Sequence, residues 1–168
     1  MFFETLQQMK KHLGLMDHWL EMATAYAKTK SFEPNVFLTL RLAPDQFAFA
    51  RQVQIACDTT KLGASRLTGK EAPSHADNEA TLDELRARIA STIKYLETFS
   101  AKDFEGSATR SVTQPRWEGK TMLGADYFRE HVVPNFYFHA AHCYAILRHN
   151  GVDVGKRDFL GPLTFQGA

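Results

Sequence analysis

The sequence predicts an all-α fold, an antiparallel four-helix bundle built as a single domain over residues 1–168. Apolar residues recur at spacings of three and four in several long stretches, which is the period of helices with one buried face. Strands and helices do not alternate along the chain, and this argues against a parallel sheet. A chain of 168 residues can bury roughly 70% of its unfolded surface in one core.

The first two helices are predicted over about 3–28 and 44–67. Pro44 favours a helix start because its fixed φ suits the first helical position, and Gly69 is a suitable end. The connector between the two helices, 31–43, contains an apolar run that could form a short strand. We expect an ordered loop there instead, because no second strand of matching quality is visible.

The third helix has the clearest start in the chain. Thr81 and Glu84 match a capping box, in which each side chain accepts a hydrogen bond from the other residue's backbone amide. The polar segment 69–80 before it is predicted to be a loop, and the helix is expected to reach about Ser100. The segment 101–123 predicts either a long ordered loop or a small hairpin.

The last helical region contains a proline. Residues 121–131 have a helical pattern, and Pro134 either opens a new helix or kinks a continuous one. Helical spacing then continues to Asn150, where Gly151 favours a stop. The tail, 152–168, has no period and is expected to form an irregular C-terminal strap.

The composition excludes several classes of function. Twenty basic and nineteen acidic residues nearly cancel, so no broad basic field favours nucleic-acid binding. Two cysteines, Cys57 and Cys143, are too few for a disulfide scaffold and fit a reducing compartment. No apolar run reaches membrane-spanning length, and the N-terminus lacks the pattern of a signal peptide. We therefore expect a soluble, cytoplasmic protein without nucleic-acid or membrane partners.

The last helix carries the densest cluster of polar side chains. Asn135 and His139 are four residues apart, and His142 follows three residues later, so the three lie near one face. Two imidazoles at helical spacing can share a transition metal, and Asp58 on the second helix is the best further ligand. The alternative is a buried histidine that makes one hydrogen bond and has no other role.

A second set of polar residues lies on the second helix. Arg51 and Asp58 are two turns apart, so they predict either a charged pocket for a polar ligand or a paired network between helices. His12 and His75 are interpreted as solvated surface residues.

Five segments taken together resemble a known family. They are RLAPD at 41–45, FARQVQIACD at 49–58, PNFYFH at 134–139, YAILRHNG at 144–151 and GKRDFLG at 155–161. The chain resembles a bacterial family of unknown function within the DinB-like (YfiT-like) superfamily. The resemblance covers nearly the whole chain and implies a DinB-like four-helix bundle, often dimeric.

Many members of that superfamily hold a divalent metal through three histidines. One lies on the second helix, and two lie four residues apart on the last. The resemblance aligns that last pair with Asn135 and His139, while the second helix offers Gln52 and Gln54. It therefore implies a metal site that has become degenerate, and a divalent metal is the cofactor to test.

Three functions follow as hypotheses. The first is binding of a small polar ligand by Asn135, His139, Gln54 and Arg51 at the degenerate site. The second is a metal-dependent transferase or hydrolase whose metal is held by His139, His142 and Asp58. The third is a structural homodimer without catalysis.

Overall fold

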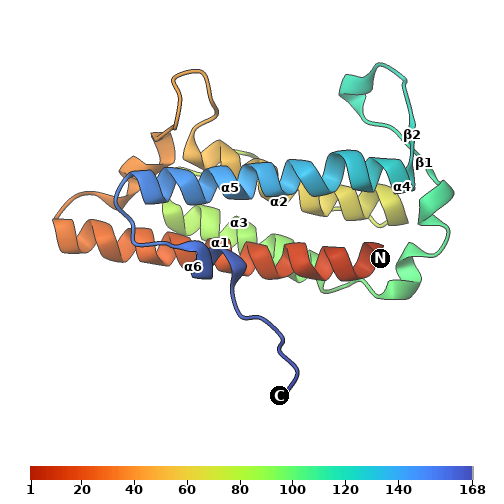
Figure 1. The fold of residues 1–168 in the computed structure, drawn as a ribbon. Coiled ribbons are helices and arrows are strands. Elements are labelled where there is room, and N and C mark those ends of the chain that lie inside the picture. The colour runs from red at the N-terminus through yellow and green to blue at the C-terminus, as the bar shows by residue number, and fades with distance from the viewer. Residues whose placement is uncertain (168) are drawn as a thin grey trace.

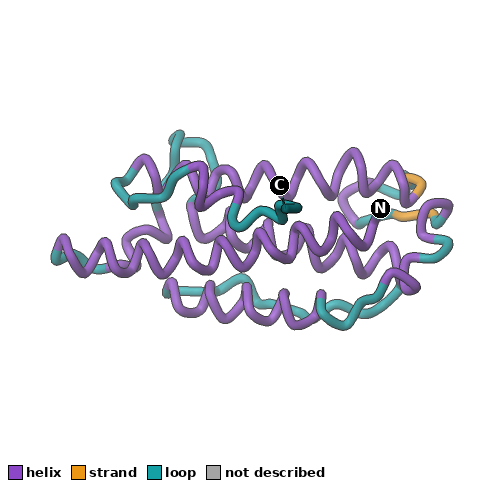
Figure 2. Tube along the Cα trace, turned by 60° about the horizontal axis from the view of Figure 1, so that its bottom comes forward, coloured by secondary structure: helices purple, strands orange, loops and turns teal. Residues whose placement is uncertain are grey.

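The computed structural model describes residues 1–167 and confirms the all-α fold class. The bundle consists of α1 (Phe2–Lys30), α2 (Phe49–Thr68), α3 (Leu82–Leu96) and α5 (Val133–His149). These helices lie side by side along their length (Figures 1 and 2). Within the described residues, no helix combines the length and the apolar character that crossing a bilayer requires.

The helices do not all alternate in direction. Along α2 and α5, Gln52 contacts His139 while Arg66 contacts Tyr127, just before α5, so these two helices are antiparallel. In contrast, α2 and α3 run in the same direction, because the chain returns along the bundle between Gly69 and Thr81 before α3 begins. The ion pairs between α1 and α3 show that these two helices are antiparallel as well. The antiparallel arrangement therefore holds for the α1–α3 and α2–α5 pairs, and the second pair forms the site below.

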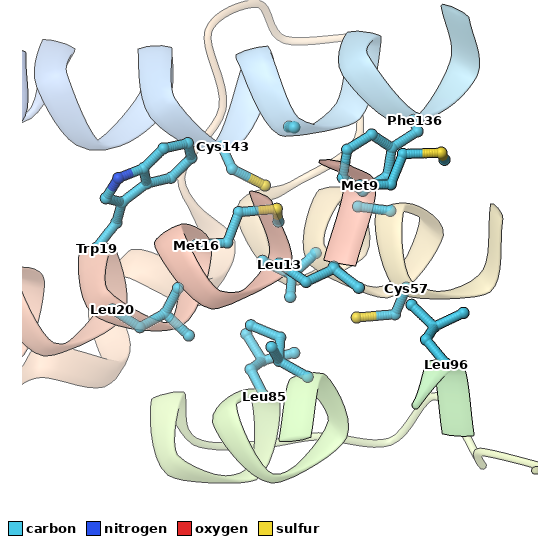
Figure 3. Close-up of a cluster of buried hydrophobic side chains, with 14 of the residues drawn as sticks. Met9, Leu13, Met16, Trp19, Leu20, Cys57, Leu85, Leu96, Phe136 and Cys143 are labelled. Carbon is cyan, nitrogen blue, oxygen red and sulfur yellow. The ribbon is translucent and has the colours of Figure 1, made fainter. Parts of the chain in front are cut away.

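The core is formed by the facing sides of the four helices. Figure 3 shows methionine, leucine and cysteine side chains of α1, α2, α3 and α5 meeting in the bundle interior. Gly63 lets α2 approach α5 closely, because a Cβ at this position would lie 2.8 Å from Cγ1 of Val132. The same close approach fixes the spacing of the two helices beside the site.

His12 is buried, so the interpretation of it as a solvated surface residue was wrong. Its ring is 3% exposed and packs edge-on against aromatic rings, including Trp19 and Phe159. Neither ring nitrogen has a hydrogen-bond partner within the described residues. Burial, followed by the charge of Lys11, lowers the pKa of His12 to about 4, so the ring is neutral at neutral pH.

The start of α2 also differs from the prediction, by five residues. The backbone amide of Gln46 donates to the carbonyl of Ala43, and that of Phe49 donates to the carbonyl of Leu40. These bonds close a loop where the sequence predicts the first helical turn, so α2 begins at Phe49. The preceding connector is an ordered loop containing a 3₁₀ helix, Pro34–Thr39, as expected.

The third helix begins as predicted. The Thr81 hydroxyl accepts from the Glu84 amide, and the Glu84 carboxylate accepts from the Thr81 amide. The helix ends at Leu96, earlier than the expected Ser100, because the Thr98 and Phe99 amides bond to carbonyls three residues back in a tighter turn.

The segment 101–123 forms a small hairpin, which is one of the two structures that the sequence predicts for it. After 3₁₀ turns at Ala101–Phe104 and Ser107–Thr109, β1 (Ser111–Val112) pairs with β2 (Met122–Leu123) in antiparallel register. A further 3₁₀ turn, Pro115–Trp117, lies in the connection between the strands.

The chain then enters one continuous helical run. The short α4 (Gly124–Asp126) passes through a π-helical turn, Tyr127–Val132, into α5. The wide turn comes just before Pro134, whose missing N–H removes one bond of a regular α-helix. Pro134 thus lies within a continuous helical run and does not open a separate helix.

The C-terminal strap contains one helical turn that the sequence does not predict, α6 (Lys156–Leu160). It packs on α1, where the Trp19 indole donates to the Asp158 carbonyl at 3.3 Å and stacks with the Phe159 ring. The strap thereby covers the side of α1 that carries His12.

Candidate functional site

A cleft of about 800 Å³ lies over the α2–α5 face of the bundle. Side chains of α2 and α5, together with the π-helical turn, form its floor. One wall comes from residues 45–47, before α2, and the other from residues 114–116 of the hairpin. In Figure 1 these two loops rise from the same side of the bundle, so the cleft is bounded at both ends.

His139 is the central side chain of the floor. Its Nδ1 lies 2.6 Å from Oε1 of Gln52, and the Gln52 amide nitrogen donates to the Phe47 carbonyl at 3.0 Å. Because that amide nitrogen faces a carbonyl, Oε1 is the acceptor and His139 carries its proton on Nδ1. The Nε2 lone pair is therefore left without a partner within the described residues.

Burial lowers the pKa of His139, and together with the smaller effects of the nearby His142 and Arg51 it brings this pKa to about 4. The ring is 5% exposed and neutral at neutral pH. A neutral imidazole with Nδ1 fixed in this way offers Nε2 as a hydrogen-bond acceptor to a ligand in the cleft.

Asn135 lies one turn before His139 on α5. Its amide nitrogen donates to the Thr59 hydroxyl on α2 at 2.7 Å. The Asn135 carbonyl oxygen is left as a second acceptor on the floor. Asn135 and His139 thus present acceptors at successive turns of one helix face.

The hairpin end of the cleft carries two arginines on aromatic partners. Arg66 donates to the Tyr127 hydroxyl at 3.0 Å, and Arg116 Nη2 lies 2.9 Å from His131 Nε2. Burial lowers the pKa of His131, and the charges of Arg116 and Arg66 lower it further. His131 is therefore neutral, and its Nε2 accepts a hydrogen bond from Arg116. The proton of the His131 ring is then on Nδ1.

The opposite end of the cleft is more apolar. Phe47 and Phe138 line it, and their side chains are 56% and 54% exposed. Gln46 also lines this end and contacts Nε2 of His142 at 3.1 Å. The lining of the cleft therefore changes along its length, from exposed phenylalanine rings at one end to the guanidinium groups of arginines at the other.

The structure brings together three of the four predicted ligand-binding residues. Arg51, Asn135 and His139 all line the cleft. Gln54 does not line it, because its amide bonds to Arg51 and to Glu79 on the side of α2 that faces α3. Gln52, two residues earlier, is the glutamine that contacts His139.

The structure does not bring the three predicted metal ligands together. His142 donates from Nδ1 to the Phe138 carbonyl at 2.7 Å and uses Nε2 to contact Gln46. Asp58 pairs through one oxygen with Arg88 at 2.7 Å and Lys61 at 3.0 Å. Across residues 1–167, no three His, Cys, Asp or Glu side chains form a group that could hold a metal ion.

The superfamily-type metal site does not fit either. His139 has a free Nε2, but the position four residues earlier is Asn135, whose nitrogen is bonded to Thr59. From α2, Gln52 supplies an amide oxygen that already accepts from His139. One imidazole nitrogen is too few for a zinc-like site, which needs at least three protein ligands.

A second polar cluster lies between α2 and α3. Arg88 is 2% exposed at its side chain and pairs with Asp58, Asp77 and Glu79 at 2.6–2.8 Å. Lys61 joins through Asp58. The sequence predicts either one pocket or one paired network for Arg51 and Asp58. The structure joins them in one network, because Asp77 pairs with both Arg51 and Arg88, and Arg88 pairs with Asp58.

The comparisons with known proteins agree with this fold. The family model described as a domain of unknown function, DUF1993, matches residues 1–160. The chain belongs to the DUF1993 family. It is also similar to a DinB family member protein from Shewanella denitrificans, whose crystal structure is known at 1.83 Å resolution.

The two chains are 49% identical, with a TM-score of 0.93. The match covers 97% of this chain and 93% of the other. The similarity confirms the predicted DinB-like bundle for this DUF1993 protein. The curated proteins contain no match to the sequence.

Proposed function

We propose that this DUF1993 protein binds a small polar molecule in the cleft between α2 and α5. The observation that carries the proposal is a cleft of about 800 Å³ whose floor presents hydrogen-bonding groups with unused capacity. Concave sites with a few convergent polar groups are the usual form of small-molecule sites.

The unused groups indicate the chemistry of the ligand. His139 Nε2 and the Asn135 carbonyl oxygen are acceptors, so the middle of the ligand carries donors such as hydroxyl or amine groups. Phe47 and Phe138 would contact an apolar part of the ligand at one end. Arg66 and Arg116 present donors at the other.

A thermal-shift screen of small polar compounds, followed by calorimetry of the hits, tests this proposal. We expect at least one class of hydroxyl- or amine-bearing compound to raise the melting temperature of the wild type. The same compounds should bind His139→Gln at least about tenfold more weakly, since a buried ligand hydrogen bond contributes roughly 1–2 kcal/mol.

The matched control is His149→Gln, the same substitution at an exposed position of the same helix. Binding to this variant should equal binding to the wild type. The proposal fails if no compound stabilises the wild type, or if both variants bind the hits equally well. Stabilisation by Zn²⁺ alone that His139→Gln abolishes would favour the metal-dependent alternative instead.

A further inference from the structure

The hairpin end of the cleft gathers positive charge from two distant parts of the chain. Arg66 lies on α2 and Arg116 lies in the hairpin, yet both donate to neighbouring rings, Tyr127 and His131. Those two rings stack with their centroids 5.5 Å apart. The two guanidinium groups are therefore held against one pair of stacked rings.

The protein does not neutralise this charge. Within the part of the chain that the structure describes, neither Arg66 nor Arg116 forms an ion pair with a carboxylate. The other arginine of the cleft, Arg51, is paired with Asp77 at 2.6 Å. Two carboxylates line the cleft: Asp45 lies on the wall opposite the hairpin, and Asp58 is already paired with Arg88 and Lys61.

The arginines are held in place by neutral acceptors. In the amide orientation that satisfies its neighbours, Gln114 accepts from Arg116 Nε at 3.2 Å and from the Trp117 indole at 2.7 Å. Each guanidinium has five N–H donors, so both arginines keep donors that the protein does not use. Holding a cation in place in advance reduces the ordering cost when an anion binds.

We propose that Arg66 and Arg116 form a subsite for an oxyanion, a carboxylate or phosphate group of the small molecule that the cleft binds. This inference rests on the proposed function and specifies its ligand. Arginine guanidinium groups bind both oxyanions through charge-assisted, often bidentate hydrogen bonds.

The apolar end lies at a defined separation from this subsite. From His131 to Phe138 is seven residues of helix, which corresponds to about 10 Å. A ligand that uses both ends therefore carries its oxyanion about 10 Å from an apolar group. The probe 7-phenylheptanoate has this form when extended, and 7-phenylheptanamide has nearly the same shape without the charge.

Calorimetry of the full chain with 7-phenylheptanoate, 7-phenylheptanamide and inorganic phosphate tests the subsite. We expect the carboxylate to bind at least about tenfold more tightly than the amide. Arg66→Gln and Arg116→Gln should each weaken binding of the carboxylate by about tenfold or more, the usual effect of losing a charge-assisted bond. Inorganic phosphate shows whether the same arginines also hold a tetrahedral anion.

Arg157→Gln is the control, because Arg157 is exposed on α6, away from the cleft. It should leave all affinities within about twofold of the wild type. Equal affinity for the carboxylate and the amide, or equal losses in the cleft variants and Arg157→Gln, would overturn the subsite. If screening hits still depend on His139 in that case, the oxyanion inference fails while the proposed function stands.

Discussion

Two polar regions lie on different sides of α2, and they differ in whether their arginines are paired with carboxylates. On the α3 side, the Arg88 guanidinium pairs with three carboxylates, although its Nε has no partner within the described residues. On the α5 side, Arg66 and Arg116 contact only neutral rings and amides. The first region joins α2 to α3, and the arginines of the second keep hydrogen-bond donors that a ligand can use.

The difference shows how a structural network can be told from a site within one helix. A buried charge whose partners are all in the protein is compensated, and removing one partner exposes the others to the full cost of burial. A cation that lies beside a cleft and has no carboxylate partner can be removed with little loss of stability, and it is free to bind an anion. Arginines in the two regions should therefore respond differently to the same kind of substitution.

The largest expected effect is on stability. Arg88→Met should lower the free energy of unfolding by about 3–5 kcal/mol, because it leaves Asp58, Asp77 and Glu79 without their common partner. Arg116→Gln, at an exposed position, should change it by no more than about 0.5 kcal/mol. Urea-induced unfolding at pH 7 measures both. Equal losses in the two variants would remove the distinction between network and site.

The pH dependence of stability compares the cleft histidine with the core histidine. His139 and His12 both have a folded-state pKa of about 4, below the usual value near 6.5. The unfolded chain therefore binds more protons, so their contribution is complete above pH 6.5 and is lost as the pH falls toward 4. Each ring accounts for roughly 3 kcal/mol over that interval, at about 1.4 kcal/mol per pKa unit.

We expect His12→Phe and His139→Gln each to reduce the loss of stability between pH 7 and pH 4.5, measured by urea unfolding at the two pH values. His149→Gln, which removes an exposed ring, should leave the loss unchanged. A ligand bound in the cleft should change only the part of the pH-dependent loss of stability that His139 contributes. A loss of wild-type size in both buried variants would contradict the assigned burial.

The smallest effect concerns the spacing of α2 and α5. Gly63→Ala brings a Cβ within 2.8 Å of Val132, and overpacking of about 1–3 kcal/mol outweighs the gain in helix propensity of about 1 kcal/mol. We expect a net loss of about 1 kcal/mol. Gly14→Ala is the matched control, since nothing lies within 4 Å of that Cβ, and it should gain about 0.5–1 kcal/mol. A gain at both positions would show that α2 and α5 can separate freely.

Features set by neighbours in the sequence could be predicted. The capping box of Thr81 and Glu84 was predicted because it depends on residues three apart. The α2 start was wrong because the Leu40–Phe49 bond, which closes the loop, joins residues nine apart and overrides the signal of Pro44. His12 could have been recognised as buried, since it lies three residues after Met9 and four before Met16 on the apolar face.

Features set by the approach of two helices were harder to predict. Helical spacing alone does not say whether Gln52 or Gln54 faces α5; the nearest signal is Gly63, whose missing Cβ marks the close contact. Arg66 and Arg116 are far apart in the sequence, and only the hairpin brings them to one cleft. The homodimer and the cytoplasmic location stay predictions.

The most direct test of the account follows the arginine Nε–H signals of the ¹⁵N-labelled full chain by NMR while inorganic phosphate is added. The account predicts saturable shifts of the Arg66 and Arg116 signals, assigned with Arg66→Gln and Arg116→Gln, while the Arg88 signal stays in place. Saturable shifts confined to the first two arginines would mean that the cleft holds an oxyanion and the network does not. Unmoved signals of Arg66 and Arg116, or equal shifts at all three arginines, would contradict it.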